Sequence, residues 1–273
     1  MNRRLLLIGI VVLAAGTIFI VLSKIKKGAA ALETKNNKSV SASNLQAQVK
    51  EFELKGDLLQ AKSSYQELIS NFPNSNEVMN WQKRAEDINI KLLFSPAIIA
   101  PKSLSYEIKP GDTLTKIARE FNTTVDLIKR SNNLNNDKIV PGRKIKVWNT
   151  PFNLLIDKSQ NTLILKSDEE IFKTYIVSTG SNNSTPVGNF KIMSKLENPT
   201  WFKAGAVVPP GSPENLLGTR WLGLNLAGYG IHGTNEPEKL GKQVTQGCVR
   251  MANSEVEELY VILPQGTEVT IVD

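Results

Sequence analysis

The sequence contains one cysteine and one histidine, Cys248 and His232, and they are sixteen positions apart. Gly233 follows the histidine and Gly247 precedes the cysteine, so the backbone can approach a substrate closely at both positions. A cysteine attacks a carbonyl as a thiolate, and its ordinary pKa of about 8.5 means that a base or a positive neighbour must assist near neutral pH. The pair therefore predicts a cysteine nucleophile with a histidine base, which is the chemistry of acyl transfer.

The residues around the cysteine strengthen this interpretation. In an extended segment Cys248 and Arg250 share one face, while Val249 and Met251 point to the other. A guanidinium beside a thiol is an electropositive environment. Taken alone, a single cysteine is more often a small buried hydrophobe, and a single histidine more often a residue with an ordinary structural role. One cysteine allows no intramolecular disulfide, and one histidine leaves a His/Cys zinc site short of ligands, so we expect no metal and no cofactor.

The two strings together resemble the signature of the YkuD-type L,D-transpeptidases, which cross-link peptidoglycan. Here His-Gly-Thr-Asn occupies residues 232–235, and Thr-Gln-Gly-Cys-Val-Arg-Met occupies residues 245–251. The segments 185–190 and 210–221 are also similar to that family, so the likeness covers residues 151–273. Two mild departures occur: Thr245 stands where serine is more usual, and Gln246 where some members carry a second histidine.

The resemblance implies a cysteine acyltransferase (EC 2.3.2.-) that acts on peptidoglycan. Cys248 would attack the carbonyl of the third residue of a donor tetrapeptide stem, release D-alanine and hold the stem as a thioester. His232 would act as base and then acid, with its ring oriented by the carbonyl of Gly233. An acceptor amine would then give a 3→3 cross-link or an attached protein. Two alternatives stay open: an L,D-carboxypeptidase, if water is the acceptor, and an inactive wall-binding scaffold.

Other residues near the motif are assigned further roles. Backbone N–H groups near Gly247 and Cys248 are the expected oxyanion donors. Arg250 would hold Cys248 ionised, bind a stem carboxylate, or form a salt bridge that fixes the loop. The candidates for substrate contact are Tyr229, Trp221 and Thr245. Packing in the core would explain Tyr229 and Trp221 equally well.

The N-terminal segment predicts a membrane anchor. Residues 5–22 carry no charge and lie between basic flanks. A helix of this length is about 27 Å long at about 1.5 Å per residue, just enough to cross a bilayer core. We expect residues 1–23 to form an uncleaved signal-anchor, with cleavage near residues 29–31 as the alternative, and residues 24–43 a flexible linker. The wall-directed motifs then indicate a single-pass membrane protein with an outward-facing catalytic domain, or a secreted protein if the segment is cleaved.

Apolar residues recur at helical spacing over residues 44–94. The pattern predicts three short helices, broken at Gly56 and at Pro73 and Asn74. It resembles a single tetratricopeptide-like unit, but such units normally stack in threes or more. We interpret it as a helical spacer that could contact a protein partner, and a stalk without binding function explains it equally well. Residues 95–104 contain two prolines and form a connector.

Residues 105–148 predict a strand, two helices and a second strand. With Tyr106, Gly-Asp-Thr-Leu at 111–114, Asn-Asn-Leu at 132–134 and Pro-Gly at 141–142, this small α+β segment resembles a LysM module. The resemblance implies binding to N-acetylglucosamine-containing glycans of peptidoglycan through two loops. Helix capping would also explain Asp112 and Thr113. The expected glycan-binding residues are Gly111, Asp112, Thr113, Asn133 and Ile139.

From residue 151 the pattern changes to short alternating strands. One helix interrupts them, with a capping box of Ser254 and Glu257 at its start and Pro264 at its end. A last strand at residues 269–271 follows. We therefore expect a mainly-β, sandwich-like catalytic domain over residues 151–273, in a multidomain chain.

Charge is distributed unevenly along the chain. Residues 1–150 carry 23 Lys and Arg against 13 Asp and Glu, whereas residues 151–273 carry 10 against 13. The basic half favours an anionic lipid surface or wall polymer as a partner. Nucleic acid is not expected, because no nucleic-acid-binding motif accompanies the pI of about 9.3.

Overall fold

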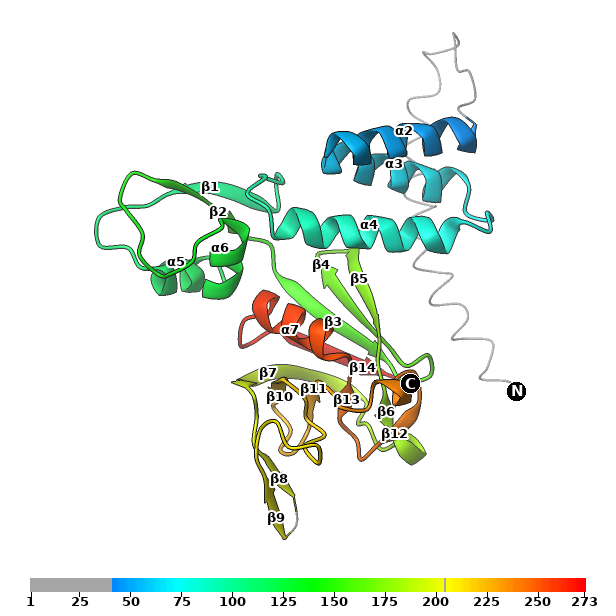
Figure 1. Ribbon diagram of the computed structural model, residues 1–273, viewed down its shortest axis with the longest axis vertical. Coiled ribbons are helices and arrows are strands. Elements are labelled where there is room, and N and C mark those ends of the chain that lie inside the picture. The colour runs from blue at the N-terminus through cyan, green and yellow to red at the C-terminus, as the bar shows by residue number, and fades with distance from the viewer. Residues whose placement is uncertain (1–40, 204) are drawn as a thin grey trace. The chain divides into compact units, whose positions relative to one another are not determined.

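The structure is a computed structural model that describes residues 41–273 except position 204. It begins with three helices, α2 (Ala42–Lys55), α3 (Leu58–Asn71) and α4 (Val78–Leu93) (Figure 1). They are interrupted where the sequence predicts, and the Asp57 carboxylate caps α3 by accepting from Gln60 N at 3.2 Å. The predicted anchor (1–23) and nearly all of the predicted linker lie outside the described residues. Within the part that is described, no helix is both long and apolar enough to span a bilayer.

The next four elements have the predicted β-α-α-β order: β1 (Ser103–Glu107), α5 (Leu114–Glu120), α6 (Val125–Ser131) and β2 (Lys144–Trp148). The two strands pair antiparallel. Thr113 and Thr124 are the N-caps of the two helices, because their hydroxyls accept from backbone N–H groups three residues later at 3.2 and 2.9 Å.

The C-terminal part is built on a mixed sheet of eight strands, in the order β13-β11-β10-β7-β14-β3-β4-β5. Its strands are β3 (Phe152–Asp157), β4 (Thr162–Ser167), β5 (Glu170–Ile176), β7 (Gly188–Glu197), β10 (Arg220–Leu224), β11 (Gly230–His232), β13 (Val249–Arg250) and β14 (Glu268–Val272). Two small sheets accompany it, formed by β6 (Thr179–Gly180) with β12 (Gln243–Thr245) and by β8 (Trp201–Lys203) with β9 (Ala206–Val208).

The long strand β7 connects the two halves of the large sheet. Residues Gly188 to Lys191 pair with β14, and the part from Ile192 to Glu197 pairs with β10. The prediction of a β-rich domain is therefore confirmed. The two halves of the sheet are joined only through β7, whose first part pairs with one half and whose second part pairs with the other.

The domain's helix, α7 (Asn253–Ile262), starts earlier than the predicted capping box. Its N-cap is Ala252, and no side chain caps it, so Ser254 lies inside the first turn. Val256, Leu259 and Ile262 are buried in the core beside the sheet. Strand β10 ends at Leu224, and Leu226 beyond it is exposed.

Helix α4 covers the outer edge of the large sheet. The Asn89 side chain donates to the carbonyl of Phe172 on β5 at 2.9 Å, and the Glu86 carboxylate accepts from Thr174 N at 3.2 Å and from its hydroxyl at 3.1 Å. Unpaired edge strands favour association with other chains, and a covering helix prevents this. The three helices are therefore not a free-standing spacer or stalk.

The small α+β module also shares a core with the β-rich C-terminal domain. Leu127 and Trp148 belong to the same buried cluster as Phe152, and the two aromatic rings stack 5.3 Å apart. Lys146 is buried, and its ammonium donates to three carbonyls at the end of α4, those of Leu92, Leu93 and Ser95. Residues Leu45–Asp273 thus form one compact unit.

Candidate active site

Strand pairing brings the two sequence motifs together. His232 ends β11, and β11 runs parallel to β13, with Ile231 opposite Val249 and His232 opposite Arg250. Cys248 immediately precedes β13. The fifteen residues between His232 and Cys248 therefore form a connection that returns the chain to the strand beside the histidine.

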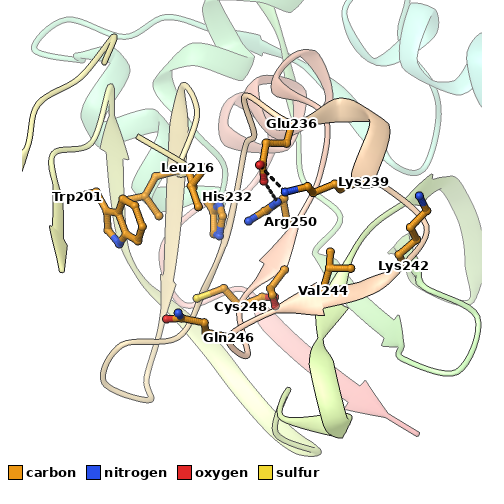
Figure 2. A pocket seen from close by; sticks show the side chains of 12 residues that line it. Trp201, Leu216, His232, Glu236, Lys239, Lys242, Val244, Gln246, Cys248 and Arg250 are labelled. Carbon is orange, nitrogen blue, oxygen red and sulfur yellow. Dashed lines mark hydrogen bonds and ion pairs between the residues drawn. The ribbon is translucent and has the colours of Figure 1, made fainter. Parts of the chain in front are cut away.

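Alternation along β13 places the side chains as predicted. Val249 and Met251 are buried in the core, whereas Cys248 and Arg250 line a pocket of about 510 Å³ together with His232. Figure 2 shows the pocket with Trp201 and Leu216 on one side of the thiol and Lys239, Lys242 and Val244 on the other. Both motif residues thus face one solvent-accessible space.

A tight turn holds the cysteine. The Thr245 hydroxyl donates to the carbonyl of Cys248 at 2.6 Å and accepts from Gly247 N at 3.1 Å. Gly247 has a φ of 128°, and a Cβ there would lie 2.7 Å from Cε1 of Tyr229. Of the two expected oxyanion donors, the N–H of Gly247 already donates to Thr245. The N–H of Cys248 has no hydrogen-bond partner among the described residues.

The histidine has a defined tautomer. Its Nδ1 lies 2.7 Å from the carbonyl oxygen of Gly233, which can only accept, so Nδ1 carries the proton and Nε2 has the free lone pair. The ring stacks on Trp221, with centroids 5.7 Å apart. His232 is 4% exposed, and this burial lowers its pKa to about 4, with a smaller contribution from the positive charge of Arg250 in the same direction. The hydrogen bond to Gly233 opposes the shift.

The thiol is also neutral at rest. Burial raises the pKa of Cys248 above its ordinary value, and the backbone of Gly230 and the charge of Arg250 offset this only in part. The thiol donates to the carbonyl of Gly228 at 3.5 Å. The expectation that Arg250 holds Cys248 ionised is therefore not met, and the resting pair is thiol and neutral imidazole.

Arg250 forms the predicted salt bridge instead. Its guanidinium lies 2.8 Å from the Glu236 carboxylate, which also pairs with Lys239 at 2.5 Å. Glu236 lies in the loop that follows His232. The ion pairs thus connect the loop after the histidine to the strand after the cysteine.

Several pocket residues were not predicted as site residues. Leu216, Leu217 and Gln246 lie within segments that resemble the family, whereas no motif surrounds the other five. Trp201 lies in the short β8–β9 hairpin, Lys239 in the 3-10 helix Pro237–Lys239 and Val244 in the three-residue strand β12. These residues are Trp201, Leu216, Leu217, Glu236, Lys239, Lys242, Val244 and Gln246. Of the predicted substrate-contact residues, Thr245 lines the pocket, whereas Trp221 packs on the imidazole and Tyr229 lies against Gly247.

The predicted glycan-binding residues cluster on the loops of the small module, where several have structural roles. Asp112 accepts from Tyr106 Oη at 2.9 Å and from Lys109 N at 2.8 Å, and Thr113 caps α5. Gly111 and Asn133 both have positive φ, and Ile139 packs on the module's own core. Their role in glycan binding stays a prediction. Among the described residues no group of three His, Cys, Asp or Glu could hold a metal ion.

Cys248 and a buried His232 whose ring its own backbone orients thus line one pocket, and this arrangement is compatible with thiol acyl transfer. Comparison with known proteins shows the family. Residues 151–271 match the L,D-transpeptidase catalytic domain of the YkuD family, and residues 106–148 match the LysM domain. A Bacillus subtilis protein named as L,D-transpeptidase YkuD is 34% identical over 175 residues, which is 62% of this chain and 98% of that protein. The chain belongs to the YkuD L,D-transpeptidase family and carries a LysM domain.

A second sequence relative agrees. The Bacillus licheniformis protein of the same name is 36% identical over 176 residues, covering 62% of this chain and 98% of that protein. A solved L,D-transpeptidase from Mycobacterium smegmatis is 19% identical with a TM-score of 0.40, covering 50% of this chain and 65% of that one. At this TM-score the family assignment depends on the sequence relatives.

Proposed function

We propose that the chain is a peptidoglycan L,D-transpeptidase that works through a thioester on Cys248. The observation that supports this most strongly is the 2.7 Å contact between Nδ1 of His232 and the carbonyl of Gly233. It leaves Nε2 unprotonated in the pocket that Cys248 also lines. A base in the correct tautomer beside a lone thiol is the arrangement that thiol acyl transfer requires.

The reaction would proceed in two steps. The thiol proton passes to Nε2 of His232 as the sulfur attacks the carbonyl carbon of the third stem residue. The bond to D-alanine breaks, His232 returns the proton to the leaving amine, and a thioester remains on Cys248. An acceptor amine then attacks the thioester and gives its proton to His232, the bond between sulfur and the acyl carbon breaks, and the released Cys248 thiolate takes that proton back. The acceptor is an amine of a neighbouring stem, which gives a 3→3 cross-link, or of a protein.

The resting protonation states fit a concerted transfer. Burial disfavours both the thiolate and the imidazolium, so the ion pair is not preformed. Substrate in the pocket would supply an electrophile at the moment of proton transfer. The free N–H of Cys248 is suited to stabilise the oxyanion, a contribution that in other enzymes is worth about 2.7–4 kcal/mol.

The LysM domain suggests where the enzyme works. We propose that this domain binds peptidoglycan glycan strands. We also propose that residues 1–23 anchor the chain in a membrane with the catalytic domain facing outward, or that the protein is secreted if that segment is cleaved. The match at residues 106–148 supports the glycan partner.

Mass spectrometry of the full-length chain with a tetrapeptide-bearing muropeptide tests the proposal. We expect a Cys248 adduct, loss of D-alanine and a cross-linked dimer. Tripeptide without dimer would indicate an L,D-carboxypeptidase, and no adduct would favour a wall-binding scaffold. As a control, Cys248→Ala should abolish turnover while binding to sacculi persists, and turnover by this variant would refute the catalytic assignment.

A further inference from the structure

Asn253, the first residue of α7, hydrogen-bonds the loop that follows the catalytic histidine. Its side-chain oxygen accepts from Thr234 N at 3.0 Å and from Thr219 N at 3.2 Å. Its side-chain nitrogen donates to the carbonyl of Thr234 at 2.8 Å. One amide group thus connects the start of α7 to two loops that are distant in sequence.

The peptide group between Gly233 and Thr234 lies between Asn253 and the imidazole. A peptide group is planar, so the N–H of Thr234 and the carbonyl of Gly233 are fixed relative to each other. The N–H is bound by Asn253, and the carbonyl is bound by Nδ1 of His232 at 2.7 Å. Holding the N–H therefore fixes the direction of the carbonyl, and hydrogen bonds in such a chain polarise one another.

Close packing restricts this arrangement further. A Cβ added at Gly233 would lie 2.1 Å from Oδ1 of Asn253, and one added at Gly218 would lie 2.2 Å from the same atom. Either contact is far inside van der Waals distance. The glycine after the histidine is thus required because the Asn253 amide occupies the adjacent space.

We propose that Asn253 is a positioning residue for acyl transfer: through the Gly233–Thr234 peptide group it holds His232 in the tautomer with Nε2 unprotonated. Its relevance to turnover rests on the proposed function. The tautomer of His232 can nevertheless be measured without substrate, and His232 is the only histidine in the chain.

Long-range ¹H–¹⁵N correlation spectra of the imidazole in the full-length protein test this inference. Asn253→Ala should admit the second tautomer and lower kcat on the tetrapeptide muropeptide by about 10- to 100-fold, with little change in KM. Asn253→Asp keeps the oxygen that accepts from Thr234 N but loses the N–H that donates to the Thr234 carbonyl, so it should retain the Nδ1–H tautomer and recover only part of kcat. Its negative charge should also raise the pKa of His232 relative to wild type.

Asn132 provides a matched control. Its side chain makes the same pair of bonds to a backbone, accepting from Lys146 N at 2.7 Å and donating to Lys146 O at 2.8 Å, but within the LysM domain. Asn132→Ala should leave the tautomer and kcat unchanged. A folded Asn253→Ala with wild-type tautomer and kcat would overturn the inference, as would an equal loss in Asn132→Ala.

Two further outcomes are decisive. If Asn253→Ala does not fold, an unchanged His232 pKa or a mixed tautomer in Asn253→Asp overturns the inference. If the wild-type protein forms no adduct at all, the proposed function fails, and the tautomer measurements still decide whether Asn253 positions His232.

Discussion

Lowering the pH should destabilise the catalytic domain through His232. Burial lowers the pKa of this imidazole from 6.5 to about 4 in the folded protein. Between these two values the unfolded chain binds a proton that the folded chain does not, so the free energy of unfolding falls as the pH falls. Above about pH 6.5 the imidazole is neutral in both states and contributes no pH dependence.

The size of the effect follows from the shift. One pKa unit corresponds to about 1.4 kcal/mol, so the loss of stability should reach about 2 kcal/mol at pH 5 and about 3 kcal/mol at pH 4. Domains of this kind are typically stable by about 5–15 kcal/mol, so the loss is a large fraction of the total.

Urea denaturation of the wild type and of His232→Gln at pH 7 and pH 5 measures this loss. Carboxylates titrate in both proteins and cancel in the comparison, so the wild type should lose about 2 kcal/mol more than the variant. The NMR signals of the single histidine give the pKa directly. Equal losses in the two proteins, or titration of His232 near pH 6.5, would refute a buried, neutral imidazole.

Three further predictions concern the turn that holds Cys248 and two sets of contacts that join α4 to the rest of the fold. Gly247→Ala should lower kcat by about 100-fold, because its Cβ would collide with Tyr229 and displace Cys248; muropeptide turnover close to wild type would contradict this. Glu86→Ala should cost about 1.5–3 kcal/mol in urea denaturation and promote self-association through the exposed edge of β5, measured by size-exclusion chromatography, whereas the exposed Glu67→Ala should do neither. Lys146→Met leaves the carbonyls of Leu93 and Ser95 without their donor and should lower the free energy of unfolding, measured by urea denaturation, by about 1.5–3 kcal/mol. Lys144 is an exposed neighbour, and Lys144→Met is the control that should leave this free energy unchanged.

The sequence was most informative where the pattern is local. Helical spacing and turn residues predicted α2 to α6, and the Thr113 cap of α5 followed from the residue type before that helix. The cysteine and histidine were identifiable because each is unique and lies within a glycine-flanked string. Alternation alone placed Arg250 on the same face as the thiol.

The remaining features depend on contacts that are distant in sequence. The strands β8, β9, β11 and β12 have three residues each, too few for alternation to be recognised. Glu236 gains its role only because β11 and β13 lie side by side, and Asn253 only because α7 begins next to the loop after His232. The protonation states also required the fold, since burial outweighs the effect of Arg250 on the thiol.

Helix α7 connects the catalytic site with the LysM domain. Its first residue, Asn253, binds the loop after His232, and near its other end the carbonyl of Val261 accepts from the hydroxyl of Thr124, the N-cap of α6. The helix is about 15 Å long. Removing the LysM domain would therefore expose core residues of the catalytic domain that pack in one cluster with Leu127 and Trp148, such as Phe152, and release one end of α7, in addition to removing the loops proposed to bind glycan. Loss of activity on truncation would follow from either cause, so the part played by glycan binding has to be measured with loop substitutions in the intact chain.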